Sequence, residues 1–265
     1  MPWHDSTDAD EPHVHSTHEL QQSTDRSYKY VVFDFDGVLC DNAALAVEAY
    51  HLLRDREFHE LPSLTSRADL GDVCAGPSRE WLHNRLDPAS AARFWTQHEQ
   101  NLGAFAGRMR LFEGIGDVLL DLPPERAAIV TGGRAERIRE VLLREMSALP
   151  PSLTVIVGGE TPGSKTDKVR QICANWGHVN GDTAFIGDTE SDVLSAQAVP
   201  VDAIAVGYGY QVREQVMRSR PSIYLETPTE LARFLRDHVS KHLDALSGFP
   251  DCGDKTHSLS MEKFT

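Results

Sequence analysis

Two aspartates, Asp34 and Asp36, end an apolar run and are separated by a single residue, Phe35. Because side chains alternate along an extended chain, both carboxylates should leave it in a common direction while Phe35 turns into the core. Carboxylates held side by side repel each other, and a divalent cation that prefers oxygen ligands, such as Mg²⁺, would compensate them. Gly37 lets the chain turn sharply beside a ligand. The pattern therefore predicts an acidic metal site rather than a strand end with solvated acids.

A second apolar run ends in the sequence GDTESD, at residues 187–192. Asp188 should complete the metal site, and Asp192, one helical turn further on, should lie on the same face. Asp188 or Thr189 could equally open a helix as its N-cap residue. The segment is therefore a candidate metal site only in combination with the other acidic residues.

Two further positions suit a phosphoryl group. Thr131 follows an apolar run and precedes Gly132 and Gly133, and a hydroxyl with free backbone N–H groups at a helix start binds phosphate oxygens. Lys165 begins a predicted helix, where an ammonium can offset carboxylates and a phosphoryl group. Lys168 is the alternative to Lys165, and an exposed surface position is the alternative for both.

Short β-rich runs alternate with helical patterns along the chain, and these elements must position the polar residues. The runs predicted as strands are residues 30–35, 127–130, 153–157, 183–186, 203–206 and 223–225. This alternation is typical of an α/β protein with a doubly wound, mostly parallel sheet. Ligands of such sheets bind at the carboxyl ends of the strands, where the acidic segments, Thr131 and Gly132 should meet.

The region from 43 to 110 interrupts the alternation. Its apolar residues have helical spacing, it is rich in Arg, His and Trp, and no run in it is long enough to predict a strand with conviction. We therefore predict an inserted α-helical cap domain over 43–110. The core domain then comprises residues 28–42 and 111–240.

The two ends of the chain read as tails. Residues 1–27 are polar and acidic, so we expect them to be disordered, and we expect their histidines to be solvated rather than metal-binding. Residues 247–265 resemble a second flexible tail. We see no basic and apolar leader typical of a secretion signal.

Composition excludes several partner classes. The net charge of −14, from 26 basic and 40 acidic residues, argues against a nucleic-acid or anionic-membrane partner. No segment approaches the length of a membrane span. The four scattered cysteines lack metal-ligand spacing and are expected to be free thiols in a cytoplasmic protein, with disulfides as the alternative. We expect a monomer or a homodimer.

The motifs, taken in order, resemble those of the haloacid dehalogenase superfamily. DFDGV at 34–38, IVTGG at 129–133, Lys165 and GDTESD at 187–192 match its four motifs in turn. The helical insertion after the first motif is similar to the cap of the phosphoglycolate phosphatase-like branch. The resemblance as a whole covers about residues 29–238. Each motif is short, so the specificity of the match lies in the complete set. The resemblance implies a Rossmann-like core with an inserted cap.

The resemblance also implies roles for the acidic residues. Asp34 would attack phosphorus and form an aspartyl-phosphate, while Asp36 would act as general acid and then as general base. Mg²⁺ would be held by the carboxylates of Asp34 and Asp188 and by the main-chain carbonyl of Asp36. Asp192 would orient metal-bound water or complete the metal site.

Substrate contacts follow from the same resemblance. Thr131, Gly132 and Lys165 would hold the phosphoryl oxygens of a small phosphorylated metabolite. Phosphoglycolate is suggested by the branch alone, and a sugar phosphate, a nucleotide or a biosynthetic intermediate stays open.

Residues of the predicted cap narrow the chemistry. The segment 43–110 contains no lysine, which argues against phosphonate hydrolysis through a Schiff base and, less firmly, against a sugar phosphomutase. Of its eight arginines, Arg79, beside a Gly-Pro turn, is our candidate for gripping a substrate anion, with a solvent-facing position as the alternative. We expect Trp81 and Trp95 to belong to the cap core.

Three functions are compatible with these motifs to different degrees. A magnesium-dependent phosphatase acting on a phosphate monoester fits every motif. A phosphomutase or phosphotransferase would pass the phosphoryl group to a second hydroxyl and release little phosphate. A non-catalytic binding protein fits worst, because Asp34, Asp36, Thr131, Lys165 and Asp188 are all present.

Overall fold

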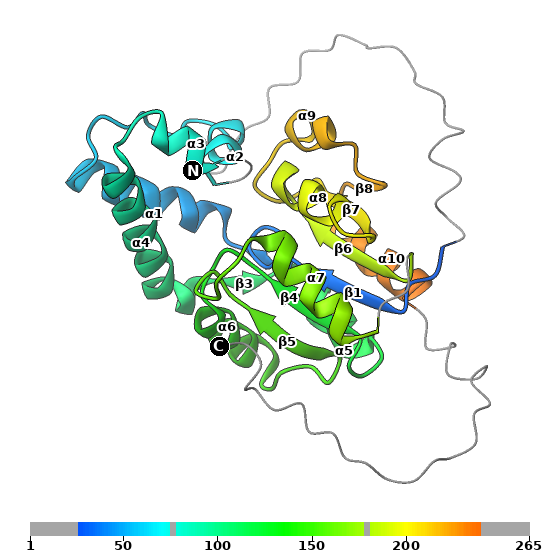
Figure 1. Ribbon diagram of the computed structural model, residues 1–265. Helices are drawn as coiled ribbons and strands as arrows, with labels where there is room; N and C mark the ends of the chain where they lie inside the picture. Colours follow the sequence, from blue (N-terminus) through cyan, green and yellow to red (C-terminus); the bar gives the residue numbers. More distant parts are fainter. Residues whose placement is uncertain (1–25, 75–77, 178–180, 240–265) are drawn as a thin grey trace, which may run out of the picture.

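The computed structural model describes residues 26–74, 78–177 and 181–239, and Figure 1 shows their arrangement. Within this part of the chain, six strands form one parallel sheet in the order β5-β4-β1-β6-β7-β8. The strands are β1 Tyr30–Phe33, β4 Ala127–Val130, β5 Leu153–Val157, β6 Thr183–Gly187, β7 Asp202–Val206 and β8 Ile223–Leu225. The predicted α/β class with a doubly wound, parallel sheet is confirmed.

Helices cover both faces of this sheet. The core helices are α5 Ile115–Asp121, α6 Ala135–Met146, α7 Lys165–Asn175, α8 Glu190–Gln197, α9 Arg213–Val216 and α10 Pro228–His238. On β1, Val31 and Phe33 belong to the hydrophobic cluster that includes α5, α6 and α10, whereas Val32 belongs to the cluster with α7, α8 and α9. Because both faces of the strands are buried, the strands read as continuous apolar runs in the sequence.

The first strand is shorter than predicted. It ends at Phe33 rather than at residue 35, and a turn follows in which Gly37 has a φ of 77°. Leu39 N and Cys40 N both donate to Phe35 O, each at 3.0 Å, which closes this turn. Asp34 therefore follows directly after the strand, and Asp36 lies at the start of this turn, where it pairs with Cys40 in an isolated bridge.

A helical insertion lies between β2 (Cys40–Asp41) and β3 (Arg110–Leu111), two short strands that pair antiparallel. Its helices are α1 Ala43–Arg56, α2 Arg67–Cys74, α3 Ser78–His83 and α4 Pro88–Ala104, followed by the 3-10 turn η2 Ala106–Arg108. Asp87 caps α4 by accepting from Ala89 N and Ser90 N, and Pro88 occupies its first turn. We did not predict the β2–β3 pair, because a two-residue strand leaves no periodicity to read.

The insertion has an aromatic centre of its own. The ring of Phe94 on α4 packs edge-on against Tyr50 of α1 and against Phe58, with centroid distances of 5.6 and 5.2 Å. The insertion also contacts the segment that follows β7. There, Arg67 on α2 donates to the carbonyls of Gly207 and Gly209, at 2.7 Å each.

The remaining predictions concern the two ends of the chain, membrane spans and the cysteines. The tails predicted at 1–27 and 247–265 lie outside the described residues, apart from residues 26 and 27. No helix in the described ranges is long and apolar enough to cross a membrane. Cys40 and Cys173 are buried and free.

Candidate active site

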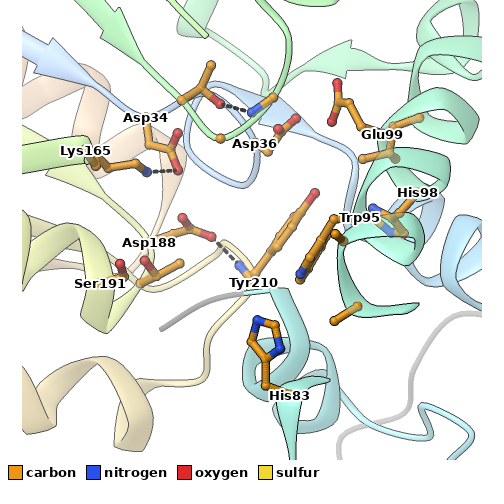
Figure 2. Close-up of a pocket in the computed structure, with 17 residues that line it drawn as sticks. Asp34, Asp36, His83, Trp95, His98, Glu99, Lys165, Asp188, Ser191 and Tyr210 are labelled. Carbon is orange, nitrogen blue, oxygen red and sulfur yellow. Dashed lines mark hydrogen bonds and ion pairs between the residues drawn. The ribbon is translucent and has the colours of Figure 1, made fainter. Parts of the chain in front are cut away.

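A pocket of about 550 Å³ opens where the carboxyl ends of the strands face the helical insertion (Figure 2). The described residues that line it are Asp34, Asp36, His83, Ala91, Ala92, Trp95, His98, Glu99, Leu102, Thr131, Gly132, Gly133, Lys165, Asp188, Thr189, Ser191 and Tyr210. Most of the predicted site residues are in this set.

Three buried carboxylates gather at the bottom of the pocket. Asp34 follows β1, Asp188 follows β6 and Asp192 lies on α8, and one oxygen from each falls within 4.8 Å of the others. Thr189, not Asp188, caps α8 by accepting from Asp192 N, so Asp188 stays available for a ligand. Asp188 Oδ2 accepts from Tyr210 N at 2.6 Å, whereas its buried Oδ1 has no partner in the described part of the chain.

Lys165 neutralises part of this charge. Its Nζ lies 2.5 Å from Asp192 Oδ1 and 3.2 Å from Asp34 Oδ2. Ser164 caps α7 in a capping box and thereby places Lys165 at the first helical position. Lys168, the alternative, donates to Gly158 O at 2.9 Å, so Lys165 is the lysine of the site.

The electrostatics of the cluster favour a cation. Burial raises the pKa of Asp34 to about 7, because Lys165 offsets only part of the cost of desolvation and of repulsion from Asp192. Burial and the neighbouring Asp192 likewise raise the pKa of Asp188 well above its ordinary value. Three carboxylates facing one ammonium leave about two negative charges when all are ionised. This charge, together with the unpartnered Asp188 Oδ1, fits a divalent cation with oxygen ligands.

Glycine is required where the chain passes closest to Asp188. Gly37 has a positive φ, and a Cβ built on it would lie 2.3 Å from Asp188 Oδ2. A Cβ on Gly209 would meet the same oxygen, also at 2.3 Å. Both glycines let the backbone approach the carboxylate, which a larger residue would displace.

Thr131 and Gly132 lie at the carboxyl end of β4, which β1 separates from β6 and Asp188, and both border the pocket. Thr131 is buried, and its Oγ1 accepts from Gly133 N at 3.1 Å. The hydroxyl and the glycine backbone thus border the pocket just before α6 begins. This position suits contacts to phosphoryl oxygens.

Asp36 takes a different direction from Asp34. Its two oxygens accept from Arg137 Nη1 and Nη2, at 2.8 Å each, and Oδ1 also accepts from Asn42 Nδ2 at 2.7 Å. Burial alone would raise the pKa of Asp36, but Arg137 holds it below its ordinary value. The expectation that the two carboxylates share one direction and one compensating cation is therefore wrong, because the chain has already turned at this point. Arg137 was not predicted, since nothing in the sequence links two residues 101 positions apart.

The opposite wall of the pocket comes from α3 and α4. Trp95 packs against the hydrophobic cluster, as expected, but it also borders the pocket, and its buried Nε1 has no hydrogen-bond partner among the described residues. Figure 2 shows Trp95 beside Tyr210, with His83 below them. Burial lowers the pKa of His98 to about 4, so this imidazole is neutral at physiological pH. Arg79 falls in α3, but its side chain lies outside the described residues.

Comparison with known proteins places this site in context. Residues 28–199 match the sequence model of the haloacid dehalogenase-like hydrolases. Phosphoglycolate phosphatase of Synechococcus elongatus is 26% identical over 212 residues, covering 76% of this chain and 94% of that protein. Tyrosine-protein kinase PtkA of Mycobacterium tuberculosis is 29% identical over 198 residues, covering 71% of this chain and 65% of that protein. A haloacid dehalogenase-like hydrolase of Streptococcus pneumoniae has a similar structure, with a TM-score of 0.65 at 18% identity over 79% of this chain and 99% of that one.

Proposed function

The chain belongs to the haloacid dehalogenase-like hydrolases, and we propose that it hydrolyses a small phosphate monoester with Mg²⁺ through an aspartyl-phosphate on Asp34. The observation that carries this proposal is the cluster of Asp34, Asp188 and Asp192 around Lys165 at the carboxyl edge of the sheet. A nucleophile, a cation site and a fixed ammonium meet there, and phosphoryl transfer depends chiefly on positioning and charge neutralisation.

The first half of the reaction is a transfer to the protein. An oxygen of the ionised Asp34 carboxylate attacks phosphorus, the bond from phosphorus to the leaving oxygen breaks, and the phosphoryl group moves to Asp34. Asp36, which Arg137 keeps ionised in the free protein, takes up the proton that the phosphate monoester brings and delivers it to the departing oxygen. Lys165 Nζ, the Thr131 hydroxyl and the backbone at Gly132 hold the phosphoryl oxygens.

The second half returns the enzyme to its starting state. Asp36 takes a proton from a water molecule that attacks the phosphorus, and the bond from phosphorus to the Asp34 oxygen breaks. Inorganic phosphate then leaves with that proton, so Asp36 is ionised again. The carboxylates of Asp34, Asp188 and Asp192 would hold the cation, together with the main-chain carbonyl of Asp36. When bound, Mg²⁺ supplies positive charge against the phosphoryl oxygens.

The helical insertion would act as a cap that excludes water from the reacting phosphorus. In this proposal the leaving group lies against α3 and α4, and an acceptor on it receives a hydrogen bond from Trp95 Nε1. The substrate is a small phosphorylated metabolite in the cytoplasm, and the protein works as a monomer or homodimer.

Transfer to a second hydroxyl is the competing function. The similarity to a tyrosine-protein kinase favours it, since such a protein moves a phosphoryl group to a hydroxyl other than that of water. Product analysis separates the two functions. A phosphatase releases one phosphate for each ester consumed, whereas a transferase forms a new ester and little phosphate.

The proposal is tested by phosphate release from a panel of phosphorylated compounds: phosphoglycolate, a sugar phosphate, a nucleoside monophosphate and phosphotyrosine. Each is incubated with Mg²⁺ or with EDTA. We expect Mg²⁺-dependent release that Asp34→Asn abolishes and that Asp121→Asn, at an exposed acid on α5, leaves intact. Release that persists at the wild-type rate in Asp34→Asn would refute the proposed nucleophile.

A further inference from the structure

One buried guanidinium joins the helical insertion to the loop that carries Asp36. The side chain of Arg137, on α6, is 3% exposed and contacts two acids from different parts of the fold. It binds both oxygens of Asp36, and on its other edge Nε lies 2.9 Å from Glu99 Oε1 while Nη2 lies 3.4 Å from Glu99 Oε2. Glu99 belongs to α4 of the insertion, so a single side chain spans the boundary between the insertion and the sheet.

The Asp36 carboxylate accepts from two side chains and still borders the pocket. Besides Arg137, it accepts from Asn42, whose Oδ1 in turn accepts from Tyr210 OH at 3.0 Å. Gly133 also permits this arrangement, because a Cβ there would lie 2.0 Å from Arg137 Nη2. Figure 2 shows Asp36 between the Asp34 side of the pocket and Glu99 on α4. With both oxygens bound in a fork, the direction of Asp36 follows the position of the guanidinium.

Glu99 is well placed to govern that position. It accepts from Arg134 N at 3.0 Å as well as from Arg137, so it is anchored at the start of α6. Any shift of α4 moves Glu99, and the guanidinium that it shares must follow or lose a partner. Because the fork of an arginine is planar and rigid, a displacement on the Glu99 edge is transmitted to the Asp36 edge.

We propose that Arg137 is a positioning residue for Asp36, and that Glu99 couples the direction of the Asp36 carboxylate to the position of the cap helix α4. This inference rests on the proposed function, since it concerns the residue that delivers a proton to the leaving oxygen. In consequence the direction of the acid–base group depends on whether α4 keeps its place against Arg137.

Leaving-group dependence provides a readout that a merely structural role would not change. A p-nitrophenolate leaves without a proton, whereas the alkoxide of benzyl alcohol needs one as its bond to phosphorus breaks. The ratio of kcat/KM for benzyl phosphate to that for p-nitrophenyl phosphate therefore reports proton delivery by Asp36. The two esters are similar in size, so a change in the pocket affects both.

The experiment compares this ratio in wild type, Arg137→Lys, Glu99→Gln and Asp36→Asn. Lysine keeps the positive charge but cannot form two forks, and glutamine keeps the shape of Glu99 without its charge. Since general acid catalysis contributes about 10²–10⁴-fold, we expect both variants to lower the ratio about tenfold or more, in the direction of Asp36→Asn. Glu57→Gln is the matched control, because Glu57, directly after α1, pairs with Arg93 of α4 at 2.8 Å, and both residues are exposed to solvent. Its ratio should equal that of the wild type.

The double variant Arg137→Lys/Glu99→Gln tests the coupling. If both residues act through one contact, its ratio should be no lower than that of Arg137→Lys alone. Equal losses for both esters in the single variants, or an unchanged ratio, would overturn the inference, as would effects of the two substitutions that simply multiply.

The two proposals fail in different ways. Release that depends on Asp34 and Mg²⁺, with an unchanged ratio in both variants, refutes the role of Arg137 and Glu99 alone. A wild-type protein that releases phosphate from neither ester and from no compound of the panel would refute the proposed function and, with it, this inference.

Discussion

Replacing Lys165 with methionine removes the ammonium that contacts two of the three clustered carboxylates. Lys165 Nζ lies 2.5 Å from Asp192 and 3.2 Å from Asp34, and both of these carboxylates are buried. Methionine is of similar length and keeps the apolar contacts of the side chain. With all three carboxylates ionised, the substitution changes the charge of the site from about −2 to about −3 with little change in packing.

The size of the effect follows from this geometry. Removing one partner of a buried ion pair costs about 3–5 kcal/mol. Because the pKa of Asp34 is raised to about 7, partial protonation relieves some of the added repulsion, and we expect the lower end of this range. About 3 kcal/mol corresponds to a fall in Tm of roughly 6–12 °C for a domain of this size. Mg²⁺ should then stabilise the variant more than the wild type, since the cation meets one more uncompensated charge.

Thermal unfolding followed by circular dichroism at about pH 7.5 measures both quantities, in EDTA and in excess Mg²⁺. Lys29→Met, at a lysine that lies over the Tyr30 ring and does not line the pocket, is the matched control and should melt like the wild type. Lys165→Met should also lose phosphatase activity in Mg²⁺. The reasoning is refuted if Lys165→Met melts with the wild type in EDTA, or if Mg²⁺ raises the Tm of both proteins equally.

Three other substitutions or conditions test separate parts of the site. Trp95→Phe removes an N–H that has no partner in the described part of the protein. The kcat/KM for the best substrate should fall about 2–10-fold, the value of one hydrogen bond, while the Tm stays unchanged. A lower Tm with full activity would show that Trp95 serves the hydrophobic core and not the substrate. Gly37→Ala puts a methyl group 2.3 Å from Asp188 Oδ2 at a φ of +77°, so Mg²⁺ should bind more weakly in a calorimetric titration, whereas Gly103→Ala, with open space around it, should bind as the wild type does. Burial raises the pKa of Asp34 from about 3.9 in an unfolded chain to about 7, so without metal this group stabilises the fold fully below pH ~4, and that contribution is lost as the pH rises to ~7. The Tm in EDTA should therefore fall between about pH 4 and 7 more steeply than the Tm in Mg²⁺, and parallel curves would contradict the raised pKa.

Much of the fold could be predicted because each element carries a local signal. The buried strands are continuous apolar runs, and the helix predicted from Lys165 has the bounds of α7, Lys165–Asn175. Parallel strands place their carboxyl ends at one edge of the sheet. From this rule the sequence predicts that Asp34, Asp188 and Thr131 belong to the same site.

The remainder depended on contacts that no local pattern encodes. Arg137 appears in the sequence as an ordinary residue of an amphipathic helix, and only the folded chain sets it against Asp36. Trp95 has the spacing of a core residue on α4, yet its indole edge borders the pocket. The end of β1 at Phe33 was missed because the apolar pattern continues to Phe35, and only the turn that closes on Phe35 O separates these residues from the strand.

The central claim is that phosphate passes through Asp34, and its most direct test is to trap the phosphorylated protein. Wild type and Asp34→Asn are mixed with substrate and Mg²⁺, quenched in acid within one turnover, and digested for mass spectrometry of the peptide that contains residue 34. We predict one added phosphoryl group on Asp34 of the wild type, which disappears with time as phosphate is released and is absent in Asp34→Asn. Phosphate release without any phosphorylated Asp34 peptide, or a phosphoryl group on another residue, would contradict the claim.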